Sequence, residues 1–145
     1  MSHTQNQTEQ PYGRFTAKMA IDIAAPHTWP ASILPVAIAV CLAIATGYVV
    51  SASLTIVLLA ICILMQSSVN TFNDYYDYVK GTDSSEDDVD PTDAVLIYNN
   101  VNPKSALAFA AALLVCAFVL GGYVIYRAGL IPLAIGVIGA VFVVI

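Results

Sequence analysis

The chain has 145 residues, of which 59% are hydrophobic and only 10% carry a charge. A soluble domain carries about 25% charged residues, so the composition excludes an ordinary soluble domain and favours membrane helices. The formal net charge of −5 is concentrated in residues 74–93, which hold eight of the ten acidic residues, and it gives no reason to expect a nucleic-acid partner.

The N-terminal part is polar and then amphipathic. Residues 1–11 are almost entirely polar, and we expect a disordered tail. Residues 12–24 are too short and too charged to span a bilayer, so they predict a helix that lies in the membrane interface. Pro26 and Pro30 follow, and proline both ends a helix and suits the first turn of a new one.

Four apolar runs fill the rest of the chain, and we expect each to be a membrane-spanning helix. Their expected bounds are about 29–50, 54–80, 104–126 and 130–145. At ~1.5 Å per residue the first run is roughly 33 Å long, which is enough to cross the hydrocarbon core. The predicted fold class is therefore all-α, a multi-pass transmembrane helical bundle with about four helices.

The basic residues predict how the bundle is oriented. Alternating crossings place the N-terminal tail and the loop 82–103 on the same side of the membrane. That side holds four of the five basic residues, Arg14, Lys18, Lys80 and Lys104, and the other side holds only Arg127. The positive-inside rule then predicts that the N-terminus and the acidic loop face the cytoplasm at the cell (inner) membrane.

A polar stripe lies at the end of the second apolar run. Asn70, Asn73, Asp74 and Asp77 fall at i, i+3, i+4 and i+7, which share one face of a helix. Carboxylates at membrane depth are costly, by about 2.5–3.5 kcal/mol, and are kept mainly where they bind something. Two carboxylates with substrate phosphates are typical Mg²⁺ ligands. The stripe predicts a Mg²⁺–diphosphate site in which Asp74 and Asp77 are metal ligands and Lys80 offsets phosphate charge. The alternative is that α-helical residues at the end of this run protrude into water, with the two carboxylates simply solvated.

The same stretch resembles a known family. Asn73-Asp-Tyr-Tyr-Asp77 and the following Lys80-Gly-Thr-Asp83 are similar to the first aspartate-rich motif of the UbiA-type intramembrane aromatic prenyltransferases, and closest to the branch that prenylates 1,4-dihydroxy-2-naphthoate. Asn70 fits a recurrent upstream asparagine of that branch. The segment 26–35 resembles the family's opening Arg-Pro-x-Thr-x-Pro sequence, although Ala25 stands where the family usually has arginine. Asp90-Pro-Thr-Asp93 stands where the naphthoate branch tends to have Gly-Pro-x-Arg.

The resemblance implies a fold of about nine helices and a reaction of menaquinone synthesis. A polyprenyl diphosphate binds through Mg²⁺ between two aspartate-rich motifs, and its allylic cation alkylates an aromatic acceptor. The implied roles are metal ligands for Asp74 and Asp77, orientation of the site for Asn70 and Asn73, and diphosphate contact or support for Lys80 and Asp83. Because the sequence holds only the first motif, we expect an N-terminal half that is inactive alone, whether a truncation, a broken gene or one subunit of a split enzyme.

Two other classes of protein are compatible with the pattern. The first is a small non-catalytic four-helix membrane protein whose cytoplasmic acidic loop binds a cation or a partner. The second is a fragment of an ion-coupled transporter with carboxylates at a cytoplasmic gate. The sequence leaves the prenyl chain length and the aromatic acceptor open.

Overall fold

The computed structural model describes residues 12–81 and 95–144, and side chains as far as residue 138. In these ranges the secondary structure is helical, apart from one isolated bridge between Gly13 and Val101, which confirms the predicted all-α class. The expected tail 1–11 and most of the acidic loop lie outside the described residues. The elements are α1 (Ala17–Ile23), the 3-10 helix η1 (Pro26–Thr28), α2 (Trp29–Ala45), α3 (Ala52–Lys80), α4 (Val95–Tyr98), α5 (Pro103–Ala128) and α6 (Ile131–Val144).

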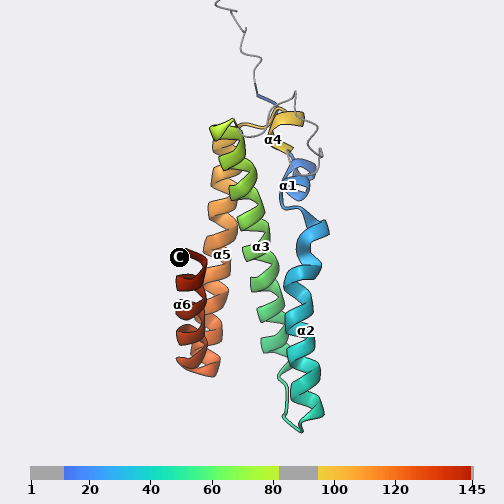
Figure 1. The fold of residues 1–145 in the computed structure, drawn as a ribbon, viewed down its shortest axis with the longest axis vertical. Coiled ribbons are helices and arrows are strands. Elements are labelled where there is room, and N and C mark those ends of the chain that lie inside the picture. Colours follow the sequence, from blue (N-terminus) through green and yellow to red (C-terminus); the bar gives the residue numbers. More distant parts are fainter. Residues whose placement is uncertain (1–11, 82–94, 145) are drawn as a thin grey trace, which may run out of the picture.

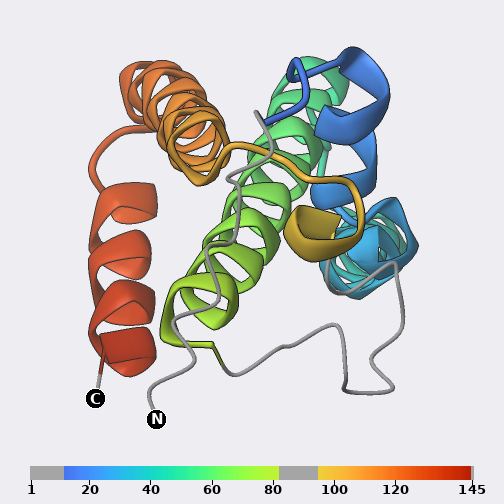
Figure 2. The same ribbon diagram turned by 90° about the horizontal axis from the view of Figure 1, so that it is seen from above.

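The long helices lie side by side, with α3 between α2 and α5 (Figures 1 and 2). Helix α6 runs back along α5. The short helices α1 and α4 gather at the end of the bundle where α3 ends and α5 begins (Figure 1). The polar end of α3 is therefore covered by α1 and α4 rather than left to project from the bundle.

The helix limits follow from capping residues. Helix α3 begins where Ser51 Oγ accepts the Leu54 N–H, and it ends at Gly81, whose φ of +66° is the left-handed conformation that glycine favours. Helix α5 begins after Asn102, whose side chain accepts the Lys104 N–H at 2.9 Å. Helix α2 ends at Ala45, earlier than the expected residue 50, because the chain turns at Gly47 with φ +84°.

Three stretches are long and apolar enough to cross a membrane: Ala17–Ala45, Ala52–Lys80 and Pro103–Ala128. The first contains a break, because Ala25 has φ +49° and separates α1 from the rest. Helix α2 alone has 17 residues, which at ~1.5 Å each gives about 26 Å. Helix α6 is apolar throughout its 14 residues and is about 21 Å long by the same measure.

Small residues bring α3 and α5 together. Ala106 and Ala110 of α5 are fully buried, and Ser68 of α3 donates its hydroxyl to the Ala110 carbonyl at 2.9 Å. In a membrane, small side chains and interhelical hydrogen bonds of this kind drive helix association, since the lipid is as apolar as the helices. The packed pair of helices α3 and α5 supports the site.

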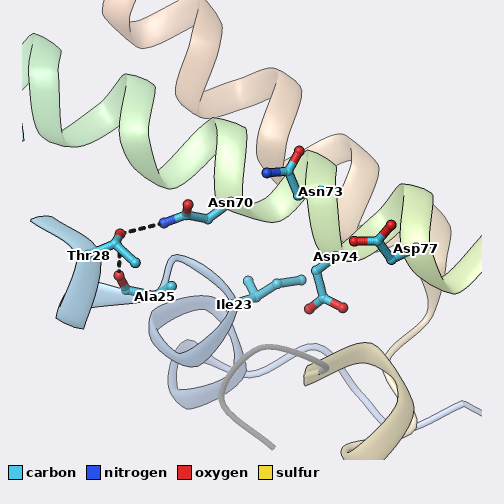
Figure 3. Close-up of a pocket in the computed structure, with 7 residues that line it drawn as sticks. All are labelled: Ile23, Ala25, Thr28, Asn70, Asn73, Asp74 and Asp77. Atoms are coloured by element: carbon cyan, nitrogen blue, oxygen red, sulfur yellow. Dashed lines mark hydrogen bonds between the residues drawn. The ribbon is translucent and has the colours of Figure 1, made fainter. Parts of the chain in front are cut away.

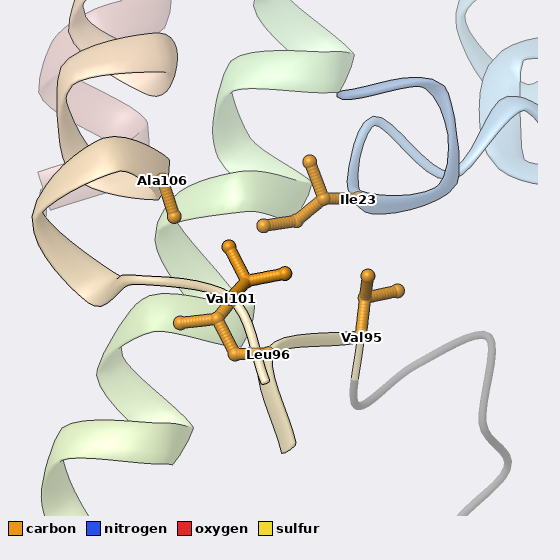
Figure 4. Packing of buried hydrophobic residues seen from close by; sticks show 5 residues of the cluster. All are labelled: Ile23, Val95, Leu96, Val101 and Ala106. Carbon is orange, nitrogen blue, oxygen red and sulfur yellow. The ribbon is translucent and has the colours of Figure 1, made fainter. Parts of the chain in front are cut away.

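A hydrophobic cluster fixes α1 and α4 at this end of the bundle (Figure 4). Its buried members are Ile23, Val95, Leu96, Val101 and Ala106, each at most 2% exposed. Helix α4 was not predicted, because residues 82–103 read as one loop. Its formation depends on contacts with distant segments, and Gly13 adds a backbone hydrogen bond to the Asn100 carbonyl at 3.1 Å.

Candidate functional site

A pocket of about 200 Å³ lies where the polar end of α3 meets α1 and η1 (Figure 3). All four residues of the predicted stripe line it, and the facing wall comes from the segment that joins α1 to α2. The lining residues are Ile23, Ala25, Thr28, Asn70, Asn73, Asp74 and Asp77. The helical spacing of the stripe therefore does bring these amides and carboxylates to one cavity.

The four stripe residues differ in burial. Asp74 is only 7% exposed, Asn70 and Asp77 are half-buried, and Asn73 is exposed. Desolvating a carboxylate is expensive unless something compensates its charge. Two carboxylates therefore lie one helical turn apart on the wall of one pocket, one of them buried and the other half-buried.

Asn70 is held in three hydrogen bonds. Its Nδ2 donates to Thr28 Oγ1 at 2.8 Å and to the Ala24 carbonyl at 3.2 Å, and its Oδ1 accepts from Gln66 Nε2 at 3.2 Å. The Thr28 hydroxyl in turn donates to the Ala25 carbonyl at 2.9 Å (Figure 3). Asn70 thus ties α3 to the segment between α1 and α2.

This tie belongs to a longer series of polar contacts between α3 and the start of α2. Ser32 Oγ donates to Gln66 Oε1 at 2.9 Å, and Trp29 Nε1 donates to Ser67 Oγ at 3.0 Å. Trp29 is therefore hydrogen-bonded within the bundle. Sequence reasoning missed these residues, although the polar run 66–68 inside an apolar helix was a readable signal.

One carbonyl group at the end of α1 accepts from a side chain of α3, since the Ala24 carbonyl accepts from Asn70 Nδ2 at 3.2 Å. The Thr71 hydroxyl is 3.4 Å from the Ile23 carbonyl, but its single hydrogen is directed at the Ser67 carbonyl at 2.8 Å. Carbonyls at a helix end lack intrahelical partners, so the contact with Asn70 stabilises the end. The next residue, Ala25, has φ +49°, a conformation that costs a non-glycine residue roughly 1–2 kcal/mol.

Lys80, another predicted site residue, does not line the pocket. Lys80 lies at the last position of α3 and is exposed, and its Nζ is 5.7 Å from the centroid of the Tyr76 ring. Asp83 lies outside the described residues. Two neighbouring tyrosines, Tyr75 and Tyr78, pack against the hydrophobic cluster, so they support the end of the bundle.

The pocket's donor set fits a hard divalent cation that is shared with a phosphorylated ligand. In the described ranges no three His, Cys, Asp or Glu side chains form a cluster that could hold a metal ion. The two carboxylates of Asp74 and Asp77 and the amide oxygen of Asn73 are oxygen donors, and Mg²⁺ sites often combine one or two carboxylates with substrate phosphates and water.

Residues 32–145 match the UbiA prenyltransferase family. The chain belongs to this family. The match covers α2, α3 and the whole aspartate-rich stretch, and it begins just after the wall residues Ala25 and Thr28. Members of the UbiA family are membrane prenyltransferases and are generally metal-dependent. Together with the three candidate spans, membership makes this chain a membrane protein.

One curated relative is the 1,4-dihydroxy-2-naphthoate octaprenyltransferase of Bacillus subtilis (strain 168). It is 33% identical over 119 residues, which cover 77% of this chain and 37% of the relative. The chain therefore spans little more than a third of the length of that UbiA-family protein. No solved structure shows a significant match to the chain.

Proposed function

We propose that this chain forms one side of the diphosphate site of a Mg²⁺-dependent membrane prenyltransferase. The enzyme would transfer a polyprenyl group from its diphosphate to an aromatic quinone precursor of the menaquinone pathway. The observation that carries the proposal is the pocket at the polar end of α3, whose lining includes both Asp74 and Asp77. The name of the Bacillus subtilis relative supports the choice of a naphthoate acceptor.

In this proposal Asp74 and Asp77 hold the metal ion, and Asn73 contributes an amide at the pocket's open side. Bound Mg²⁺ would neutralise charge on the diphosphate as it leaves. Lys80 and Asp83 would support the diphosphate and the metal from the end of α3. The long apolar helices α2, α3 and α5 would shelter the prenyl chain from water, which would otherwise intercept a reactive allylic cation.

The family that the sequence resembles is expected to use two aspartate-rich motifs, and residues 1–145 hold only the first of them. We therefore expect a purified 145-residue chain to bind the metal and a diphosphate without transferring a prenyl group. Turnover by that chain alone would show that one motif suffices.

We also propose that the pocket faces the cytoplasm at the cell membrane. Four basic residues belong to the segments at the end of the bundle that holds the pocket: Arg14 precedes α1, Lys18 lies in α1, Lys80 ends α3 and Lys104 lies in the first turn of α5 (Figure 1). Arg127 belongs to the last turn of α5, at the opposite end. The positive-inside rule favours this orientation, in which a water-soluble diphosphate group reaches the carboxylates without crossing the bilayer.

The experiment that tests the proposal is thermal protection of the detergent-solubilised chain. Methylene diphosphonate, a non-hydrolysable diphosphate, should raise Tm only when Mg²⁺ is present, and Asp77→Asn should abolish the rise. Asp22→Asn is the matched control, because the Asp22 carboxylate pairs with exposed Lys18 at 2.7 Å and does not line the pocket. Equal protection without Mg²⁺ would contradict the proposal, and protection by Mg²⁺ alone would favour a non-catalytic cation-binding protein.

A further inference from the structure

We propose that Asn70 and Thr28 are positioning residues that hold one wall of the pocket, and that Asn70 does not itself contact the metal or the diphosphate. This inference rests on the proposed function for its ligand. It makes the orienting role that the family resemblance implies for Asn70 specific, because Asn70 donates to Thr28 and to the Ala24 carbonyl.

The hydrogen-bonding capacity of Asn70 is largely used within the protein. A carboxamide has two N–H donors and one oxygen acceptor, and the two donors go to Thr28 Oγ1 and the Ala24 carbonyl. The oxygen accepts from Gln66. A metal ion would have to compete with the Gln66 contact for the amide oxygen. Asp74 and Asp77 line the same cavity with carboxylates.

The direction of these hydrogen bonds is fixed. An amide nitrogen can only donate, so Thr28 Oγ1 accepts from Asn70 and its single hydrogen is directed at the Ala25 carbonyl at 2.9 Å. The chain of contacts runs from α3 through Thr28 to Ala25. Valine has nearly the shape of threonine but neither accepts nor donates, so it would break both contacts at once.

The residue at the end of this chain of contacts is strained and lines the pocket. Ala25 is 7% exposed, with φ +49°, and lies on the wall with Ile23 and Thr28. A left-handed alanine persists only where the surroundings hold it. Without the Asn70–Thr28 tie, the turn can relax toward an ordinary conformation, and the wall opposite Asp74 and Asp77 moves with it.

A fixed wall matters because a site that is already shaped for its ligand loses less free energy on binding. The tie therefore predicts an effect on ligand affinity that loss of stability alone would not produce. Ser67 provides the matched control. It makes a similar contact from α3 to α2, through Trp29 Nε1 at 3.0 Å, and it does not line the pocket.

The test compares four variants of the 145-residue chain in detergent by calorimetric titration with methylene diphosphonate at saturating Mg²⁺, and by ligand-free Tm. Thr28→Val breaks both hydrogen bonds and should weaken binding about tenfold, because part of the binding free energy is then spent on ordering the wall. Thr28→Ser keeps the hydroxyl and should bind within about twofold of wild type. Ser67→Ala should lower Tm as Thr28→Val does and leave the affinity unchanged.

Asn70→Asp separates positioning from ligation. The variant loses both donors but gains a charge, so a metal ligand at this position would bind Mg²⁺–diphosphonate more tightly. A positioning residue predicts weaker binding by about tenfold, and tighter binding would overturn the inference. Wild-type affinity in Thr28→Val would overturn it as well. If the wild-type chain binds no diphosphonate, the proposed function is wrong. The inference about Thr28 can then still be tested without ligand: equal ligand-free Tm values for Thr28→Val and Thr28→Ser would show that the Thr28 hydroxyl does not hold the wall.

Discussion

Replacing Asp74 by asparagine removes the most buried charge of the pocket while keeping its shape. A ligand present at about 100 times its Kd stabilises a protein by about 2.7 kcal/mol. For a chain of 145 residues, 1 kcal/mol corresponds to a Tm shift of about 3 °C, so wild type should gain about 8 °C. Loss of one desolvated charged partner costs about 2–5 kcal/mol, and a value of about 2.7 kcal/mol weakens Kd about a hundredfold.

At the same ligand concentration the Asp74→Asn variant then has about as much ligand as its Kd, and the remaining stabilisation of about 0.4 kcal/mol raises Tm by about 1 °C. The assay is differential scanning fluorimetry of the solubilised chain with methylene diphosphonate and Mg²⁺. Asp22→Asn serves as the control, since Asp22 lies outside the pocket. A shift of about 8 °C in Asp74→Asn would refute the assignment of Asp74 as a metal ligand.

Two further predictions concern the bundle around the site. Leu96→Ala should lower Tm by several degrees, because Leu96 is 1% exposed and large-to-small changes at such positions cost about 2–5 kcal/mol. Leu42→Ala is the control and should change Tm little, because Leu42 is 61% exposed. Equal Tm shifts in the two variants would argue against the packing of α4. In a chain whose native cysteines are replaced by alanine, Arg127→Cys should react with a membrane-impermeant maleimide from outside intact cells and Lys80→Cys only after lysis. The reverse labelling pattern would invert the proposed orientation.

The sequence predicts the long helices because each depends on local information. The sequence itself shows apolar runs of membrane length, and it shows the residues that end or begin a helix: Gly81 after α3 and Asn102 before α5. Helix α4 could not be predicted in this way. Its four residues follow an acidic stretch, and two of them, Val95 and Leu96, are buried because Ile23, far away in sequence, and Ala106, in the next helix, pack against them.

Only the side of the site that α3 contributes could be predicted from the sequence. The spacing of the stripe from Asn70 to Asp77 places it on one helix face, and the structure brings the stripe to one cavity. The opposite wall depends on the left-handed turn at Ala25, which no local signal for alanine predicts. The resemblance implied an orienting role for Asn70, but helical periodicity cannot tell which partner a polar side chain meets across a helix interface, so its contact with Thr28 could not be predicted.

The central claim is that Asp74 and Asp77 bind a divalent metal together with a diphosphate. The most direct measurement is electron paramagnetic resonance of Mn²⁺, an oxygen-preferring substitute for Mg²⁺, titrated into the solubilised chain with and without methylene diphosphonate. We expect Mn²⁺ to bind only when the diphosphonate is present, and we expect this binding to be lost in the Asp74→Asn, Asp77→Asn double variant. Undiminished, diphosphonate-dependent Mn²⁺ binding in that variant would contradict it.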